Sequence, residues 1–202
     1  QTGLFVFLAL REEKYLELLA GLSKDPETYE AVLSYLAKAY PGWSGDFVFN
    51  PRNRLLASAL RKRDAEFYPE QQKLAFAGAV PKISTDGIVP FSEEYAAAYF
   101  ALHEKDACWT GEKVAAAPDR FRILLALSEG EIVGYLDVTY GFPENEPYDL
   151  FVQEAYRRKG YGRKLLAKAM EQNAPARLSL LVDKENLPAC RLYASMGFQR
   201  VE

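Results

Sequence analysis

The stretch AYRRKGYGRKLL, residues 155–166, holds five basic residues and two glycines. Its second half has the apolar spacing of a helix that begins near Gly160. A helix N-terminus already carries partial positive charge, so basic residues there cost stability unless an anion lies nearby. Glycines at 160 and 162 let the chain turn tightly and let a ligand approach the main-chain amides. The stretch therefore predicts a cradle for a small anion such as a diphosphate.

The bulk composition makes this positive charge local. The 202 residues carry a net charge of −3, which argues against general binding to nucleic acid or to an anionic membrane. Apolar residues make up 49% of the chain, enough for a sizeable core in one domain, or in one domain with a partial second one. Two cysteines, Cys108 and Cys190, do not suggest a disulfide framework, and no apolar run reaches the length of a membrane helix. We expect a cytoplasmic protein.

The region before residue 80 is predicted to be mainly helical. Apolar residues at helical spacing indicate helices within 4–40, although the run at 4–10 also fits a buried strand. Beyond it we expect a strand at 46–49, a helix at 53–62 and a strand somewhere in 66–80. The stretch at 80–90 is rich in Pro, Gly and Ser, and it predicts a boundary between a smaller region, 1–82, and a main domain, 83–202.

The main domain reads as strands that first pair in hairpins and then connect through helices. A helix begins at Ser92 and continues to about Leu102, and a short helix begins at Thr110 or Gly111. The further elements are strands at 122–128, 131–140, 148–153, 176–182 and 198–201, and helices at 160–173 and 188–196. This order predicts an α/β (α+β) fold with a mixed, mostly antiparallel sheet flanked by helices.

A second motif follows the basic loop. In LLVDKENLPACRLYASMGF, residues 180–198, Asn186 is placed to cap a helix with Pro188 in its first turn, and Gly197 ends that helix. Together with Arg157, Gly160 and Gly162 of an Arg-x-x-Gly-x-Gly loop, this resembles the GNAT superfamily of acyl-coenzyme A-dependent N-acyltransferases. The matching residues of the second motif are Asn186, Ala189, Tyr193, Gly197 and Phe198. The order of elements from about 88 to 201 is also similar to that family.

The resemblance implies a site for acetyl-coenzyme A (acetyl-CoA). Its pyrophosphate would lie on the amides and cations of the loop: Arg157, Arg158, Lys159, Gly160, Tyr161, Gly162 and Arg163. The strand that holds Leu150, Phe151 and Val152 would bind the pantetheine arm and the thioester carbonyl, and it would splay from the 131–140 strand. Asn186 and Ala189 would touch the pantetheine arm. Tyr193 would protonate the leaving thiolate, although periodicity alone would place it in the core with its hydroxyl at the edge.

The general base stays open at this point. Asp137 lies on a strand that flanks the expected slot, and Glu144 and Glu146 follow in the next loop. The only histidine, His103, is more typical of a structural or solvated residue. Its expected partners are Tyr99 and Trp109, which could instead line the pocket for the acceptor amine. No Cys/His cluster has metal-binding spacing, so we predict no metal.

The N-terminal half contains a degenerate echo of the second motif. Residues 47–67 and 180–198 both read as strand, turn ending in Asn, helix and aromatic residue. The echo has no Arg-x-x-Gly-x-Gly loop, and Leu60 or Arg61 stands where the counterpart of Tyr193 would be, so we expect no coenzyme A binding there. We expect the family's usual final hairpin strand to be absent after the strand at 198–201. The N-terminal half could cover that sheet edge; left open, the edge would allow a homodimer.

The function predicted from these residues is acetyl-CoA-dependent N-acetylation of a primary amine on a small molecule or peptide. Amine attack on a thioester needs a donor for the developing oxyanion and an acid for the leaving thiol. The alternative is a non-catalytic module that senses acyl-CoA. A weaker one is a nucleotide-phosphate binder that uses the same cradle.

Overall fold

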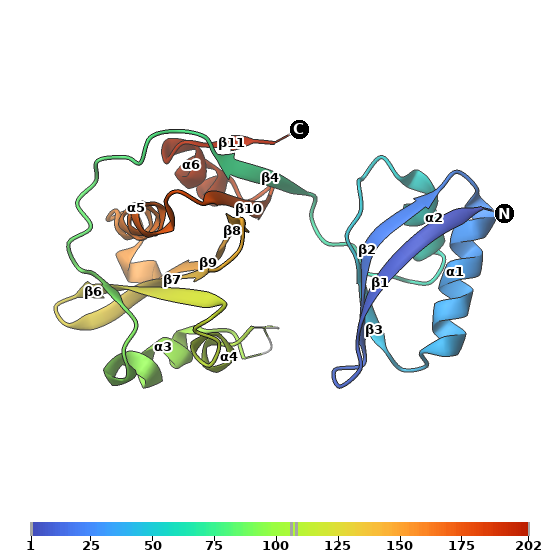
Figure 1. The fold of residues 1–202 in the computed structure, drawn as a ribbon, viewed down its shortest axis with the longest axis horizontal. Coiled ribbons are helices and arrows are strands. Elements are labelled where there is room, and N and C mark those ends of the chain that lie inside the picture. The colour runs from blue at the N-terminus through green and yellow to red at the C-terminus, as the bar shows by residue number, and fades with distance from the viewer. Residues whose placement is uncertain (1, 106, 108, 202) are drawn as a thin grey trace. The chain divides into compact units, whose positions relative to one another are not determined.

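The computed structural model describes residues 2–105, 107 and 109–201. The chain divides into two compact units, Gln1–Tyr68 (the N-terminal unit) and Pro69–Glu202 (the C-terminal unit), each visible in Figure 1. Among the helices described, none is both long and apolar enough to cross a membrane.

The N-terminal unit is a three-stranded sheet covered by two helices. Its elements are β1 (Gly3–Leu10), β2 (Tyr15–Ser23), α1 (Pro26–Ala39), β3 (Ser44–Phe47) and α2 (Arg54–Arg61). β1 and β2 form an antiparallel hairpin, and α1 carries the chain over to β3, which pairs parallel to β2. Leu16 and Leu18 of β2 pack against Tyr29 and Leu33 of α1 and Leu56 of α2.

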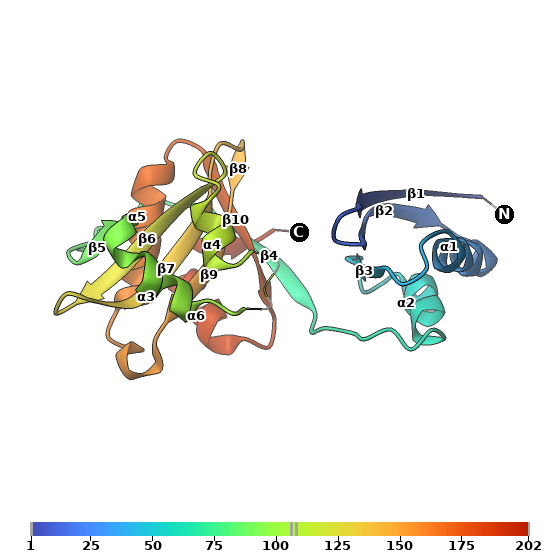
Figure 2. The same ribbon diagram turned by 90° about the horizontal axis from the view of Figure 1, so that it is seen from below.

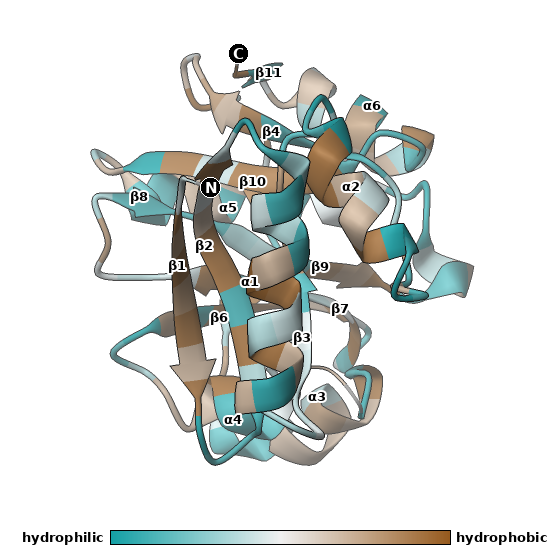
Figure 3. Cartoon of the chain, turned by 90° about the vertical axis from the view of Figure 1, so that its right-hand side faces the viewer, coloured by the Kyte–Doolittle hydropathy of each residue, from teal (hydrophilic) through white to brown (hydrophobic). Residues whose placement is uncertain are grey.

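The prediction of helix from residue 4 was wrong for the first twenty residues or so, which form β1 and β2. The apolar residues there alternate: Phe5 and Phe7 pack on the core, whereas Leu4, Val6 and Leu8 are exposed. Figure 3 shows the result as an apolar band along both strands. Because both faces of the hairpin are apolar, the period of two that marks a strand is hidden in the sequence.

The C-terminal unit follows the predicted order of elements closely. Its strands form two sheets, with orders β5-β6-β7-β9 and β11-β4-β10-β8. The strands are β4 (Gln71–Phe76), β5 (Ile88–Pro90), β6 (Phe121–Ser128), β7 (Glu131–Thr139), β8 (Glu144–Asn145), β9 (Pro147–Val152), β10 (Arg177–Asp183) and β11 (Phe198–Arg200). The helices are α3 (Ala96–Leu102), α4 (Gly111–Ala115), α5 (Tyr161–Asn173) and α6 (Leu187–Ser195), with 3₁₀ turns at Glu93–Tyr95 and Glu154–Tyr156. The mixed, mostly antiparallel α/β fold is confirmed.

Helices cover both faces of the sheet β5-β6-β7-β9. α5 packs on one face, where Leu165 and Leu166 meet Leu124 and Leu136. α3 and α4 cover the other face, where Tyr99 and Val114 meet Leu125 and Tyr135. Figure 1 shows α5 on one side of this sheet and α3 and α4 on the other, and Figure 2 shows α3 and α4 crossing the strands as seen from below. Alternate residues of β7 therefore enter two different cores.

β4 is inserted between β10 and β11, antiparallel to both. The sequence predicted that residues before Ile88 could cover an edge of the sheet, and β4 is the strand from that region that pairs with it. The division between the units lies before β4, whereas the sequence placed the boundary in 80–90. That stretch instead connects β4 to β5 inside the C-terminal unit, because backbone pairing holds β4 in this sheet.

The strands separate at a different junction from the one expected. β9 does not splay from β7; the two strands pair from Gly134↔Val152 to Val138↔Pro147. The break is between β9 and β10, which belong to different sheets. Only the short β8 bridges them, through the parallel pairs Arg177↔Glu144 and Leu178↔Asn145. β9 and β10 therefore do not pair with each other among the described residues, and α5 connects them. We call this unpaired junction the gap.

Candidate active site

The loop before α5 presents main-chain amides that the protein does not use. Arg158 and Gly160 both adopt positive φ, +64° and +93°. The first intrahelical bond is donated by the Lys164 amide to the Gly160 carbonyl at 3.1 Å. In the described part of the chain, the amides of Arg158, Lys159 and Gly160 have no acceptor, and no side chain caps the helix. These N–H groups are free for an anion.

Gly160 is required by its backbone conformation, and the space beside it is open. Its φ of +93° is a backbone conformation that side chains rarely adopt. A Cβ built there would meet no protein atom within 4 Å, so the space above the loop is open. Gly162, by contrast, is closely packed, since a Cβ would lie 3.2 Å from Leu192 Cδ2. The loop combines an open cradle with a tight helix contact.

The loop cations are not all equally available. Arg157 Nε donates to the Val152 carbonyl at 3.0 Å and so braces the end of β9. Lys159 Nζ lies 4.9 Å from the centre of the Tyr156 ring, which in turn packs edge-on against Tyr161. Arg158 and Arg163 are exposed. Positive charge therefore surrounds the free amides without neutralising partners close by.

Leu150, Phe151 and Val152 lie half-buried on β9, which pairs with β7 along one edge only. Within the described residues, the opposite edge of β9 has no strand partner, so its main-chain groups can bind a ligand. Across the gap, Asn186 caps α6 by accepting from the Ala189 amide at 3.2 Å. Asn186 is an exposed residue.

Tyr193 on α6 is 8% exposed and packs edge-on against Phe198. Its hydroxyl makes no hydrogen bond to any of the described residues. Burial, followed by the nearby charges of Asp149 and Glu146, raises the pKa of Tyr193 to about 12. The phenol is therefore protonated at neutral pH, as an acid for a leaving thiolate must be.

Asp137 is completely buried on the α3 side of β7. Its Oδ1 accepts from the Tyr99 hydroxyl at 2.8 Å. Burial raises the pKa of Asp137 to about 8, against the opposing effect of the Tyr99 hydrogen bond. The sequence offered it as a candidate base, and its environment holds it close to the range in which proton transfer at neutral pH is efficient.

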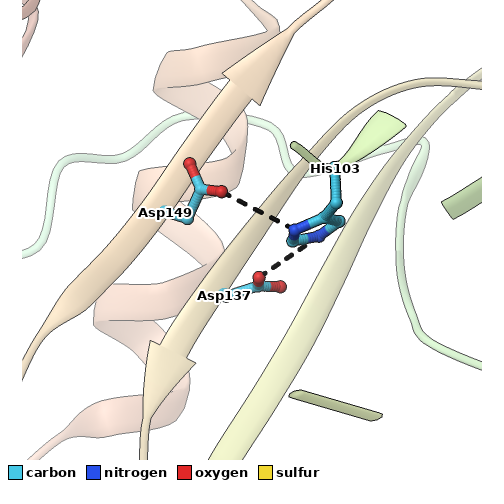
Figure 4. Close-up of side chains that lie close together, drawn as sticks. All are labelled: His103, Asp137 and Asp149. Carbon is cyan, nitrogen blue, oxygen red and sulfur yellow. Dashed lines mark ion pairs between the residues drawn. The ribbon is translucent and has the colours of Figure 1, made fainter. Parts of the chain in front are cut away.

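Asp137 does not stand alone. His103 Nε2 lies 3.4 Å from Asp137 Oδ2, and His103 Nδ1 lies 3.8 Å from Asp149 Oδ2 on β9. Each ring nitrogen thus faces a different carboxylate (Figure 4). The ring stacks on Tyr135, with centroids 4.2 Å apart. Burial lowers the pKa of His103, against the charges of Asp149 and Glu112.

Among the other residues predicted for acid–base or acceptor roles, Tyr99 touches this cluster, whereas Glu144, Glu146 and Trp109 make different contacts. Glu144 pairs with Lys73 at 3.0 Å, and Glu146 accepts from the Leu181 amide at 3.3 Å, so both help to join strands. Tyr99 is fully buried behind Asp137, and we assign it to holding that carboxylate. Trp109 packs on Phe121 with the Arg120 guanidinium over its ring.

Asp149 is the site residue that the sequence did not suggest. It is the direct register partner of Asp137 across the β7–β9 pair, and its side chain is 43% exposed. Its charge also contributes to the raised pKa of Tyr193, so it connects the two sides of the gap. The signal was the alternation within 148–153, which becomes informative only once the register with β7 is known.

His103, Asp137 and Asp149 also offer donor atoms within 4.8 Å of one another, a set that a divalent cation can use. The geometry is nevertheless that of a bridge, because the two ring nitrogens face different carboxylates and one ion takes only one of them. The absence of a metal stays a prediction.

The comparisons with known proteins place the chain in a family. Residues 88–198 match the model of the acetyltransferase (GNAT) family, which is more than half of the chain. The protein therefore belongs to the GNAT acetyltransferase family.

Individual relatives are more distant. A mycothiol acetyltransferase of Amycolatopsis mediterranei is 32% identical over 105 residues, which cover 50% of this chain and 35% of that protein. An uncharacterized N-acetyltransferase of Bacillus subtilis, YycN, is 38% identical over 87 residues, 39% of this chain and 54% of that protein. The matched region thus spans about a third to a half of these relatives. A GCN5-related N-acetyltransferase from Sphaerobacter thermophilus has the same fold, with a TM-score of 0.66 at 14% identity, over 98% of this chain and 73% of that one.

Proposed function

We propose that this protein transfers an acetyl group from acetyl-CoA to a primary amine of a small molecule or peptide. The observation that carries the proposal is the uncapped, glycine-based start of α5, with free amides and surrounding cations, directly beside the gap between β9 and β10. Membership of the GNAT acetyltransferase family supports it. A cytoplasmic location and a homodimer stay predictions from the sequence.

Each part of the site has a separate task in this proposal. The amides of residues 158–163 hold the diphosphate, while the open edge of β9, with Asn186 and Ala189 opposite, aligns the pantetheine arm. Acetyl-CoA supplies the acetyl group. An amide of β9 donates to the carbonyl oxygen as negative charge develops on it, a contribution of about 3 kcal/mol for one such donor. The neutral acceptor nitrogen forms the new C–N bond, the C–S bond breaks, and the thiolate takes its proton from the Tyr193 hydroxyl. The proton that the nitrogen then loses restores the Tyr193 hydroxyl by way of solvent.

Substitution of Tyr193 by Phe tests the proposal. It keeps the packing against Phe198 and removes only the proton donor. We expect kcat to fall by about 10²-fold, since general acid catalysis contributes on that order. Release of free thiol from acetyl-CoA in the presence of an amine panel measures it. The affinity for coenzyme A, measured by calorimetry, should stay within about twofold.

Tyr35→Phe is the matched control, because Tyr35 is an exposed tyrosine of the N-terminal unit. Unchanged acetyl transfer by the Tyr193 variant would remove this residue from the mechanism. Acetyl-CoA binding without turnover on any amine would favour the alternative function, a module that senses acyl-CoA.

A further inference from the structure

A pair of buried polar atoms lacks hydrogen-bond partners. His103 Nε2 and Asp137 Oδ2 are both inaccessible to solvent, and neither has a hydrogen bond among the described residues. A buried polar atom without a hydrogen-bond partner destabilises the folded protein. The two atoms face each other at 3.4 Å, so a single proton placed between them satisfies both.

The register of β7 and β9 explains why this pair exists. Asp137 and Asp149 are directly opposite on paired strands, an arrangement that is unfavourable when both are charged. Asp149 accepts from the Tyr135 hydroxyl at 2.7 Å and reaches solvent, whereas Asp137 is closed in. His103 bridges the two, with Nε2 toward the buried carboxylate and Nδ1 toward the exposed one.

The imidazole is held in this position from both sides. It stacks on Tyr135 at an interplanar angle of 17° and meets the edge of Tyr99. From α4, Gly111 approaches so closely that a Cβ there would lie 2.9 Å from His103 Cδ2. The titratable groups acting on the ring are Tyr99 and Tyr135 beside it, Asp137 and Asp149 at its nitrogens, and the charge of Glu112 on α4. Every charged group among these is acidic, so the site favours a cation at its open end.

We propose that Asp149, His103 and Asp137 form a proton relay that takes a cationic alkylammonium acceptor at Asp149 and removes its proton. This inference rests on the proposed acetyl transfer and names the acceptor class of that same site. Asp149 binds the ammonium, whose proton passes to His103 Nδ1. The proton on Nε2 moves to Asp137 Oδ2, and the neutral amine is left with the lone pair that attacks. Afterwards the Asp137 proton returns to Nε2, and the Nδ1 proton leaves to water beside Asp149.

The roles of the three residues differ. Asp149 touches the acceptor and is 43% exposed, while the side chain of His103, at 3% exposure, takes the proton. Asp137 is a positioning residue, because it acts only through His103. The relay accepts a proton when Asp137 is ionised, so kcat/KM rises with pH. The midpoint of the rise should lie near the pKa of Asp137, which burial raises to about 8.

Nitrogen-15 NMR of His103 tests the relay without any activity measurement. His103 is the only histidine of the chain, so the two ring-nitrogen signals need no assignment to a residue, and their couplings to the ring protons tell Nδ1 from Nε2. We expect the chemical shifts of both nitrogens to change together near pH 8, because the proton on Nε2 moves to Asp137 as the pH is lowered. We expect Asp137→Asn to abolish this change. A titration near 6.5, the value of a free imidazole, that is indifferent to both Asp137→Asn and Asp149→Asn would overturn the relay.

Kinetics with two acceptors provides a second, independent readout. With an alkylamine such as cadaverine, His103→Gln should lower kcat/KM at pH 7 by about 10²-fold or more. Its pH dependence should then move toward the pKa of the free amine, about 10 for a lysine-like group. With aniline, which is uncharged at neutral pH, the same variant should lose little, because there is no ammonium proton to remove. Equal losses with both acceptors would contradict the relay.

Further variants separate the relay from structural effects. Tyr99→Phe keeps the ring and removes the hydrogen bond that lowers the pKa of Asp137, so the rise of kcat/KM should shift to higher pH. Asp119→Asn, in an exposed turn, is the matched control and should change nothing. Loss of activity in EDTA that Zn²⁺ restores would overturn the relay in favour of a metal site.

The outcomes also distinguish this inference from the proposed function. If no amine is acetylated while His103 shows the coupled titration near pH 8, acetyl transfer fails as the function, and the relay loses the reaction assigned to it. If alkylamines are acetylated while His103 titrates as a free imidazole, the function stands and the relay fails.

Discussion

The N-terminal unit and the second half of the C-terminal unit contain the same order of main elements, and they differ at the places that the proposed function uses for ligand binding. The N-terminal unit runs hairpin β1–β2, crossover helix α1, parallel strand β3 and helix α2; the C-terminal unit runs hairpin β7–β9, helix α5, strand β10 and helix α6. Even the helix caps agree, since Asn53 and Asn186 have φ, ψ of −77°, 71° and −75°, 69°. β4 follows α2 as β11 follows α6, although β4 pairs in the C-terminal sheet.

The differences lie where a ligand would enter. β2 and β3 pair directly over four residue pairs, from Tyr15↔Ser44 to Leu18↔Phe47, so no gap opens in the N-terminal unit. α1 begins with Asp25, whose carboxylate accepts from the Glu27 amide at 3.0 Å, whereas α5 begins with an uncapped Gly160. The buried Leu60 stands in α2 where Tyr193 stands in α6, seven residues after the cap. In the proposed function, strand pairing and helix capping rather than topology therefore decide which of the two units binds coenzyme A.

The largest change in stability that we expect comes from a substitution in β4. This strand follows the N-terminal unit in the chain but pairs in the C-terminal sheet. Leu74 is 6% exposed in the C-terminal core, so Leu74→Ala should lower the free energy of unfolding of that unit by about 2–5 kcal/mol. The two tryptophans, Trp43 and Trp109, lie one in each unit. Urea unfolding followed by the fluorescence of Trp109 in a Trp43→Phe background measures the loss.

The control is Leu181→Ala, at an exposed position on β10, the neighbouring strand. It should change the free energy of unfolding by no more than about 0.5 kcal/mol. If Leu74→Ala destabilised only the unit that Trp43 reports, β4 would belong to the N-terminal unit rather than to the C-terminal sheet.

Much of the C-terminal fold and of the candidate site could be predicted, because it depends on residues that are close together in the sequence. The proposed cradle depends on two glycines and a helix start within twelve residues, and Asn186 and Gly197 flank the helix that carries Tyr193. The start of the chain was misread because its strands are apolar on both faces. The relay could not be derived, since the meeting of His103, Asp137 and Asp149 depends on a hairpin register and on α3 packing over it. The position of the gap likewise depends on pairing, which spacing does not encode.

A substitution that gives α5 an acidic start like that of α1 should have the next largest effect. Gly160→Asp places a carboxylate against the proposed diphosphate and strains a residue at φ +93°. We expect the dissociation constant of coenzyme A to rise at least about tenfold, or roughly 1.4 kcal/mol. Calorimetric titration with coenzyme A measures it, and the loss should diminish at high salt because screening weakens charge repulsion.

The reverse substitution in α1, Asp25→Gly, is the matched control. It should leave coenzyme A affinity unchanged, because the closed strand pair beside α1 offers no slot. Gain of coenzyme A binding by the N-terminal unit in this variant would show that the cap alone separates the two repeats. Undiminished affinity in Gly160→Asp would remove the cradle from the proposed function.

The smallest effect we expect is the energy of the cap itself. Asp25 accepts from the Glu27 amide and, at 3.1 Å, from the Thr28 hydroxyl. Asp25→Ala should therefore cost about 1 kcal/mol in the free energy of unfolding of the N-terminal unit, the usual worth of an N-cap. Fluorescence of Trp43 in a Trp109→Phe background follows that unit.

Gly160→Ala offers the contrast, because no side-chain cap is lost at α5 and its cost in the free energy of unfolding comes only from the positive φ. Ligand should then separate the two helices: coenzyme A should raise the unfolding midpoint reported by Trp109 and leave that reported by Trp43 unchanged, because binding stabilises only the unit that binds.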